Sequence, residues 1–455
     1  MRITIAPLLL SALIGSATCL TASAQHSAYT PPLGTKTLYV PGNDTDAPAP
    51  AGYAPFFINY VGRHGARHAT GTAELQRLDS FLQEAAGAGA LRADGLRLHR
   101  MVQTLLAVEN SYSSGRLTAI GEAEQYRIGK DMGQEYPGVV RQPDDSLLVV
   151  STPELRTAQS AEQFLKGLAS GSRNVTRSPN DSIRLRFFSL SPAYKDFEKI
   201  GAWKTAQARL ESADSYRSAN ASILSRLFDS ARTTQLLEGK CSAFTKPGAF
   251  TMAMYAAAVL APGLKEELRL AGYQPEDADI FSLISPQEAA ALDFVDAARD
   301  FFVKGPGLDA RGIQVRVAAP LLADFIQSSD EWLAGGRKGA DLRFAHAETI
   351  APIAALMGCE GAAVAVTDPF RYAEVWRSDR LIGYSANIQW VFYRDSAGNC
   401  LLKVLYNERP IHLPLGASQY PYYSWKEVRE YYLRILHSLD ADPGRDMYEY
   451  LQSLK

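Results

Sequence analysis

Residues 63–67, with the sequence Arg-His-Gly-Ala-Arg, combine the residue types that phosphoryl transfer requires. Three potential cations so close together repel one another unless an anion lies between them. The arginine side chain presents a planar fork of donors that suits phosphate oxygens, and a neutral imidazole between two arginines can attack phosphorus. If residues 63–67 are considered alone, a solvated basic turn explains them about as well as a catalytic loop does, because short motifs produce frequent false matches.

Two segments further along the chain carry residues of the same kinds. Arg156 lies in 151–160, and His346 and Glu348 lie in 344–349. Each of the three segments follows a short apolar run that is typical of a buried strand and precedes a helical pattern; the runs are 56–61, 147–150 and 342–345. The ends of strands are where open α/β sheets place their sites.

These motifs resemble those of the histidine acid phosphatases, branch 2 of the histidine phosphatase superfamily. Residues 63–67 resemble the signature R-H-G-x-R-x-P, except that Ala69 stands where the family has proline. The His-Ala-Glu sequence at 346–348 is similar to the second signature of the multiple inositol polyphosphate phosphatases, whereas most of the family has His-Asp. The segment around Arg156 and the pair Asn407-Glu408 also fit. The resemblance runs from near residue 50 to near residue 440.

The resemblance and the chemistry together assign a role to each residue. His64 is the expected nucleophile, which forms a phosphohistidine while its second ring nitrogen is held by an acceptor. Glu348 is expected to protonate the leaving alkoxide and then to activate water. Four further side chains are expected to surround the phosphoryl oxygens: Arg63, Arg67, Arg156 and His346. Since the arginines supply the charge, no metal and no other cofactor is expected.

Simpler explanations exist for the members of this set. Arg156 could be an ordinary surface charge near a helix start. His346 and Glu348 could be a helix cap with an acidic first turn, which the helix dipole favours. The three motifs occur together and in the order found in the family. The functional interpretation is therefore stronger than the simpler explanations. Substrate specificity is expected to come from a cap and nearby loops, where the candidates are His68, Lys195 and Arg371. A role without substrate contact explains each of them at least as well.

Composition and charge narrow the class of protein. The chain has 455 residues, of which 46% are hydrophobic, enough for a large core and for about two or three domains. The formal net charge of −2 argues against bulk electrostatic binding of nucleic acid. It does not forbid a local cationic pocket. Oligomeric state is left open.

Residues 1–24 have the pattern of a secretory signal peptide. Arg2 supplies the positive end, 5–14 is a short apolar stretch, and the small residues before Gln25 predict cleavage after Ala24. The apolar stretch is too short to span a membrane, and no other segment is typical of a span. A lipoprotein site at Cys19 is an alternative, although the residues before it fit poorly. The expected location is therefore periplasmic or extracellular.

The mature chain keeps three cysteines, Cys241, Cys359 and Cys400. An odd number leaves at least one thiol free or bonded to another chain. An oxidising compartment permits one disulfide, and Cys359–Cys400 is one conceivable pair. Their spacing predicts no metal site.

The expected fold is α/β, with a mostly parallel sheet, helices on both faces and an inserted α-helical cap. Residues 25–186 and 316–455 would form the core, beginning with a loose lead-in over 25–52, and 187–315 the mainly helical cap. Residues 387–394 and 401–407 predict a β-hairpin with its turn at 395–399. Ser424 and Glu427 predict a capping box that opens a C-terminal helix.

The expected function is that of a secreted phosphomonoesterase acting on inositol polyphosphates such as phytate. Two alternatives stay open: a broad acid phosphatase without inositol preference, and a periplasmic protein that binds phosphate ligands without turnover. A metallohydrolase is disfavoured because the chain has no H-E-x-x-H motif and the residues around 346–348 offer no nearby partner ligands.

Overall fold

The computed structural model describes residues 30–42, 48–169, 174–179, 181–335, 338–417 and 419–455. Residues 31–455 belong to one compact unit. The predicted signal peptide, with Cys19, lies outside the described residues. No helix among those described is long and apolar enough to cross a membrane.

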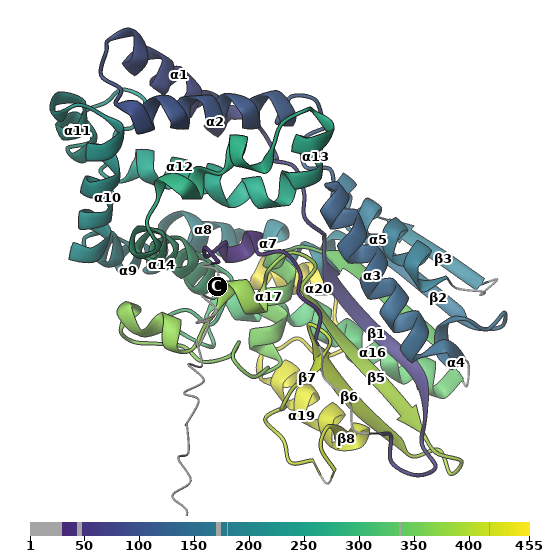
Figure 1. Ribbon diagram of the computed structural model, residues 1–455. Coiled ribbons are helices and arrows are strands. Elements are labelled where there is room, and N and C mark those ends of the chain that lie inside the picture. The colour runs from purple at the N-terminus through teal and green to yellow at the C-terminus, as the bar shows by residue number, and fades with distance from the viewer. Residues whose placement is uncertain (1–29, 43–47, 170–173, 180, 336–337, 418) are drawn as a thin grey trace, which may run out of the picture. The chain divides into compact units, whose positions relative to one another are not determined.

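An eight-stranded mixed sheet runs through this unit, in the order β3-β2-β4-β1-β5-β6-β7, with β8 paired to β6 (Figure 1). The mutually parallel strands are β1 (Ala54–Arg63), β2 (Ser146–Ser151), β3 (Asn174–Pro179) and β4 (Gly339–Ala345). The antiparallel strands all come from the C-terminal part: β5 (Asn387–Arg394), β6 (Cys400–Tyr406), β7 (Arg409–Pro410) and β8 (Tyr422–Ser424). The predicted α/β class is confirmed.

Alternation along β1 explains why helices cover both faces of the sheet. Ile58 and Tyr60 point into one core, which they share with α3 (Ala119–Glu135), α4 (Pro137–Val140) and α5 (Leu155–Leu168). Phe57 and Val61 point into the other core, beneath α16 (Ala319–Gly335), α17 (Ala347–Leu356) and α19 (Trp425–Ser438). Successive strand residues face opposite sides, so a strand that is apolar throughout must be covered twice.

The segment 187–315 contains helices and no strands, as expected. Its elements are α7 (Phe187–Leu190), α8 (Pro192–Ile200), α9 (Trp203–Glu211), α10 (Asp214–Leu227), α11 (Ser230–Leu237), α12 (Ala249–Leu260), η2 (Ala261–Leu264), α13 (Lys265–Leu270), η3 (Pro275–Ala278), η4 (Ile280–Leu283), α14 (Pro286–Val303) and α15 (Ile313–Arg316). Two helices from the expected core join this group (Figure 1): α1 (Ala73–Gly87) packs on α12, and α2 (Ala93–Glu109) packs on α10. The boundaries of a separate cap stay a prediction.

The C-terminal part matches the sequence in its elements and differs in one detail. The predicted hairpin is formed by β5 and β6, and α19 begins at Trp425. The predicted capping box is wrong: Ser424 occupies the N-cap position, but its side chain makes no capping hydrogen bond. Ser424 is at the same time the last residue of β8, paired with Leu401. The remaining elements are η1 (Gly34–Lys36), α6 (Ser182–Leu185), η5 (Pro369–Glu374), α18 (Ser378–Leu381) and α20 (Met447–Ser453).

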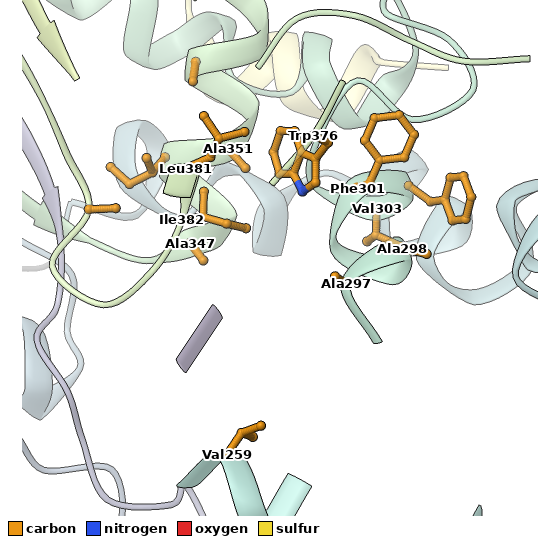
Figure 2. Close-up of a cluster of buried hydrophobic side chains, with 14 of the residues drawn as sticks. Val259, Ala297, Ala298, Phe301, Val303, Ala347, Ala351, Trp376, Leu381 and Ile382 are labelled. Atoms are coloured by element: carbon orange, nitrogen blue, oxygen red, sulfur yellow. The ribbon is translucent and has the colours of Figure 1, made fainter. Parts of the chain in front are cut away.

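The end of α14 and the start of α17 are fixed relative to each other by buried apolar side chains. Figure 2 shows Phe301 of α14, Ala347 and Ala351 of α17, Trp376 and Ile382 within one cluster. The rings of Phe301 and Trp376 lie 5.9 Å apart, centroid to centroid. This packing therefore fixes the distance between polar side chains at the end of α14 and those at the start of α17.

The three cysteines among the described residues are free thiols. Cys241 and Cys359 are buried and Cys400 is half-buried, and the conceivable pair Cys359–Cys400 is not formed.

Candidate active site

The three chemistry-bearing segments meet at the carboxyl ends of adjacent strands. His64 follows β1, Arg156 lies just beyond β2, and His346 follows β4; the order of these strands is β2-β4-β1. The His64 main-chain N–H donates to the Ala345 carbonyl at 3.0 Å. The rings of His64 and His346 are edge-on with centroids 5.6 Å apart. The expectation that these segments lie where strands end is confirmed.

Two glycines allow helix α3 to press directly on the His64 loop. A Cβ on Gly65 would lie 2.4 Å from the Gly121 carbonyl oxygen, and a Cβ on Gly121 would lie 1.9 Å from that of Ala66. Real side chains do not come so close, so both positions require glycine. The Gly65 N–H donates to Ser160 Oγ of α5 at 3.2 Å, which ties the loop to a second helix.

Two further α3 residues hold the same loop through polar contacts. The buried Glu124 carboxylate accepts hydrogen bonds from the Ala66 N–H at 3.0 Å and from Ser385 Oγ at 2.8 Å. Gln125 Nε2 donates to the Arg63 carbonyl at 3.0 Å. Burial raises the pKa of Glu124, although these hydrogen bonds oppose the effect. Nothing in the sequence of α3 beyond its helical pattern indicated this role.

The His64 imidazole is buried, neutral and held in one tautomer. Its Nδ1 lies 2.9 Å from the Gly65 carbonyl oxygen, which can only accept, so Nδ1 carries the proton. Nε2 is then left with its lone pair. Burial lowers the pKa of His64 well below its ordinary value, and the charges of Arg63 and Arg67 lower it further. The expectation that an acceptor holds the second nitrogen is met, and Nε2 is left with the free lone pair that a nucleophile requires.

Three arginines surround this imidazole with different degrees of restraint. Arg63 is buried; its Nη1 donates to the carbonyls of Thr35, at 2.6 Å, and Ile382, and its guanidinium lies 4.8 Å from the centre of the Tyr384 ring. Arg67 donates from Nη1 to the His68 carbonyl at 2.8 Å. The Nε atoms of Arg63, Arg67 and Arg156 are all buried and have no partner among the described residues, which leaves these donors available to an anion.

Arg156 and His346 form one hydrogen-bonded unit at the start of helix α5. Arg156 Nη1 lies 3.1 Å from Glu154 Oε2, and Nη2 lies 3.4 Å from His346 Nδ1. His346 Nε2 lies 3.0 Å from Thr152 Oγ1. Burial and the charge of Arg156 lower the pKa of His346 to about 3, so its ring is neutral.

Glu348 lies in the first turn of α17 and forms an ion pair that the sequence did not predict. Its Oε1 is 3.0 Å from Lys304 Nζ, and Lys304 also lies 2.8 Å from Asp300 Oδ1. Burial alone would raise the pKa of Glu348, but the charge of Lys304 outweighs it and holds that pKa well below its usual range. The carboxylate is therefore ionised.

Lys36 is a second cation that the sequence did not indicate. The lead-in was expected to be loose, yet η1 lies against the site: Thr35 accepts from Arg63, and Lys36 Nζ lies 6.0 Å from the centre of the Tyr384 ring. Burial lowers the pKa of Lys36 to about 7, helped by the charges of Arg67, Arg63 and Lys304. The site thus has a lysine that titrates near neutrality.

The three specificity candidates lie in different surroundings. His68 is 1% exposed, stacks on Tyr112 at 4.4 Å and pairs with Glu109 at 3.4 Å, which leaves it no free face for a ligand. Arg371 forms an exposed ion pair with Glu374 at 2.7 Å. Lys195 lies exposed on α8. The roles of all three in specificity stay predictions.

Comparison with known proteins agrees with this architecture. The model of the histidine phosphatase superfamily (branch 2) matches residues 57–236. Multiple inositol polyphosphate phosphatase 1 of Gallus gallus is 23% identical over 408 residues, covering 86% of this chain and 84% of the chicken protein. The Bifidobacterium longum multiple inositol polyphosphate phosphatase, crystallised with inositol hexasulfate, superposes with a TM-score of 0.78 at 22% identity over 90% of this chain and 98% of that one. The phytase from D. castellii gives 0.61 at 14% identity, over 92% and 86%.

The matched residues 57–236 include most of strand β1 and the loop 63–67 that contains His64. Residues 57–236 of the chain match branch 2 of the histidine phosphatase superfamily, and the chain is similar to a multiple inositol polyphosphate phosphatase over most of its length. The proteins of similar sequence or fold include multiple inositol polyphosphate phosphatases and a phytase.

Proposed function

We propose that the chain is a phosphomonoesterase that hydrolyses inositol polyphosphates such as phytate through a phosphohistidine on His64. The observation that carries the proposal is a buried, neutral imidazole between Arg63 and Arg67, with Nδ1 on the Gly65 carbonyl and Nε2 unprotonated. The names of the relatives support the inositol polyphosphate as substrate class.

In the first step, Nε2 of His64 attacks phosphorus in line with the ester oxygen. A P–N bond forms and the P–O ester bond breaks, and the departing alkoxide takes a proton from Glu348. Arg67 and Arg156 hold the phosphoryl oxygens, where charge spreads in the transition state. In the second step, Glu348 takes a proton from water, which attacks phosphorus and breaks the P–N bond.

The ion pair with Lys304 places a condition on this mechanism. Because its pairing with Lys304 keeps Glu348 ionised, the proton that it donates has to arrive with the substrate. A phosphate monoester has a second pKa near 6, so its monoanion brings one proton at mildly acid pH. The negative charge of the bound phosphates also raises the pKa of the neighbouring Glu348 carboxyl. The enzyme should therefore work best on the acid side of neutrality.

The cations around the site favour a substrate with several phosphates over a simple monoester. Lys36 and Lys304 supplement the three arginines close to His64, and their charges act on one another. Mutual repulsion of this kind is relieved by a polyanion. Secretion belongs to the same proposal and depends on the signal peptide at 1–24.

The test compares the specificity constants, kcat/KM, for phytate and for nitrophenyl phosphate. A clear preference for phytate is expected, and equal constants would favour a broad acid phosphatase. A rapid denaturing quench with radiolabelled substrate, followed by alkaline work-up, should place the label on His64, and His64→Ala should abolish turnover. Label on another residue would contradict the proposed nucleophile. Binding of phytate without any steady release of phosphate would favour a binding protein instead.

A further inference from the structure

We infer that Tyr39 is a positioning residue: its hydrogen bond to Glu408 holds the N-terminal segment 31–39 across the active site and thereby keeps the ammonium group of Lys36 in that site. The inference rests on the proposed function, in which Lys36 adds positive charge for a polyanionic substrate. It also gives a role to Glu408, which belongs to the pair Asn407-Glu408 and which the proposed mechanism does not use.

The hydroxyl of Tyr39 makes two hydrogen bonds that together fix its ring. It donates to Glu408 Oε2 at 2.9 Å and accepts from Asn387 Nδ2 at 3.0 Å. Burial and the charge of Glu408 raise the pKa of Tyr39 well above its ordinary value, so the phenol keeps the proton that it donates. The guanidinium of Arg127 lies 5.2 Å from the centre of the Tyr39 ring, and its Nη2 lies 3.5 Å from Glu408 Oε2. The ring and its acceptor are therefore held together from both sides.

Glu408 is presented to Tyr39 by a turn of uncommon backbone geometry. Asn407 and Glu408 have φ values of 51° and 63°, in the left-handed region that side chains rarely adopt. Asn407 Oδ1 accepts from the Asn387 N–H at 2.9 Å, which fixes the turn. Glycine would adopt this conformation without strain. The glutamate is therefore explained by its side-chain contacts with Tyr39 and Arg127 rather than by its backbone.

Tyr39 also brings the main chain of the segment into contact with the site. Its N–H donates at 2.8 Å to Glu124 Oε1, and the other oxygen of that carboxylate holds the loop of the nucleophile. Two residues earlier, the Thr37 carbonyl accepts from the Tyr384 N–H at 2.9 Å. Both bonds lie within two residues of the Tyr39 ring, so their alignment depends on the position of that ring.

Lys36 has no anchor of its own. Among the described residues its ammonium group forms no ion pair and no hydrogen bond, and it lies 6.0 Å from the centre of the Tyr384 ring. The charged groups that face it come from the end of β1 and from α14; they are Arg63, Arg67, Asp296, Asp300 and Lys304. Three of these five are cations, which repel Lys36. The segment must therefore hold it in place.

Arg63 depends on the segment much less than Lys36 does. Its Nη1 donates to the Thr35 carbonyl of the segment but also to the Ile382 carbonyl, and its guanidinium lies on the Tyr384 ring. If the segment loosens, Arg63 keeps the contacts with Ile382 and Tyr384, whereas Lys36 moves with the segment. An effect of Tyr39 on anion binding is therefore expected to pass through Lys36.

The first test follows the titration of the Lys36 side chain by carbon NMR, with its signal identified by its absence from Lys36→Met. In the wild type the pKa of Lys36 is lowered to about 7; in Tyr39→Phe the group should move into water and its pKa should rise towards the ordinary 10.5. Glu408→Gln keeps an acceptor oxygen and should behave as the wild type does. Tyr432→Phe is the matched control, because it removes a different buried hydroxyl, which donates to the Met357 carbonyl at 3.1 Å.

Two outcomes of this titration would overturn the inference. One is an unchanged pKa of Lys36 in Tyr39→Phe, which would show that the hydroxyl does not hold the segment. The other is a wild-type Lys36 that titrates near its ordinary value, which would show that the segment does not place this group in the site.

The second test asks whether Tyr39 acts on anion binding through Lys36. At pH 6, where Lys36 is charged, Tyr39→Phe should weaken the binding of inorganic phosphate about three- to tenfold, the usual range for one hydrogen bond. Tyr432→Phe should bind as the wild type does. In a Lys36→Met background, Tyr39→Phe should cost little further, because the group that it positions is gone. No loss in the first background, or an equal loss in both, would overturn the inference.

The two tests separate this inference from the proposed function. The titration of Lys36 needs no substrate, so it decides the role of Tyr39 even if phytate is not hydrolysed. If the wild type does not bind inorganic phosphate at all, the proposed function fails, while the NMR comparison still decides whether Tyr39 positions Lys36.

Discussion

Lys304 Nζ and the Glu348 carboxylate lie 3.0 Å apart, in an ion pair that joins the last turn of α14 to the first turn of α17. The apolar cluster around Trp376 keeps the two helix ends in place (Figure 2). The ion pair favours the base form of Glu348, which the hydrolysis of the phosphohistidine needs, and opposes the acid form, which the departure of the alcohol needs. The proposed mechanism therefore depends on how this pair responds to a bound anion.

Lys304→Met should raise the pKa of Glu348, because the opposite charge that lowers it is removed. At acid pH the carboxyl would then be protonated and unable to act as base. Turnover of nitrophenyl phosphate should fall at pH 4–5 more than at pH 7, with a burst of nitrophenol at acid pH. Lys304→Arg, which keeps the charge, is the control. Identical pH profiles for Lys304→Met and the wild type would show that the pair does not govern Glu348.

Activity on nitrophenyl phosphate should be unaffected by EDTA. The positive charge that stabilises the transferring phosphoryl group comes from arginines, and among the described residues no group of three or more His, Cys, Asp or Glu side chains is arranged to hold a metal ion. Tungstate or vanadate should inhibit, because each mimics the transferring group. Loss of activity in EDTA, restored by a divalent ion, would contradict the metal-free mechanism.

Anion binding should be coupled to protonation of Lys36. Its pKa is lowered to about 7, chiefly by burial and then by neighbouring cations, so Lys36 is charged below that pH and neutral above it. A bound anion favours the charged form, so at pH 8 the wild type should take up as much as one proton on binding tungstate. Calorimetry in two buffers of different ionisation enthalpy measures this uptake. Lys36→Arg is charged throughout and should show none; equal uptake in both proteins would contradict the assignment.

The sequence was sufficient for the parts of the site that lie within its motifs. His64, Arg156 and His346 each follow a strand whose apolar run is visible in the sequence, and parallel pairing brings them together. It was not sufficient for Lys304 and Lys36, because each reaches the site from an element with no motif. Their positions depend on packing between segments far apart in the chain, which local pattern does not encode.

The same reasoning explains why the close contact between Gly65 and Gly121 was missed. Glycine in a helix usually marks weak local preference, whereas Gly121 in α3 is required by the backbone of the loop at Ala66. The role of Gly121 depends on its contact with Ala66, which lies 55 positions earlier in the chain. A glycine that is destabilising by helix propensity is therefore favourable in the folded protein.

Gly121→Ala should destabilise the protein, by about 1–3 kcal/mol for overpacking of a tight contact, and should lower kcat because the His64 loop moves. Gly87→Ala is the matched control. Gly87 also lies in a helix, but it is exposed, and a Cβ there meets nothing within 4 Å. That variant should be neutral or slightly stabilising. Thermal unfolding together with steady-state turnover measures both effects. A fully active Gly121→Ala would show that the contact between α3 and the loop is not needed for function.

Glu348→Gln should slow esters with poor leaving groups far more than those with good ones. An inositol alkoxide needs a proton as the P–O bond breaks, whereas a nitrophenolate leaves without help. General acid catalysis contributes about 10²–10⁴-fold, and the loss on phytate should lie in that range. The burst on nitrophenyl phosphate should persist, followed by slow turnover, because the same carboxylate is missing as the base for hydrolysis of the phosphohistidine.

Arg156→Ala provides the contrast for this variant. Arg156 holds phosphoryl oxygens that both substrates share, so its loss should weaken turnover of phytate and nitrophenyl phosphate alike. Stopped-flow release of nitrophenol and steady-state phosphate release distinguish the two patterns. If Glu348→Gln loses activity equally on both substrates and shows no burst, then Glu348 only caps α17 and pairs with Lys304, and another group must protonate the leaving alcohol. Asp300, which shares Lys304 with Glu348 at 2.8 Å, would be the next carboxylate to replace.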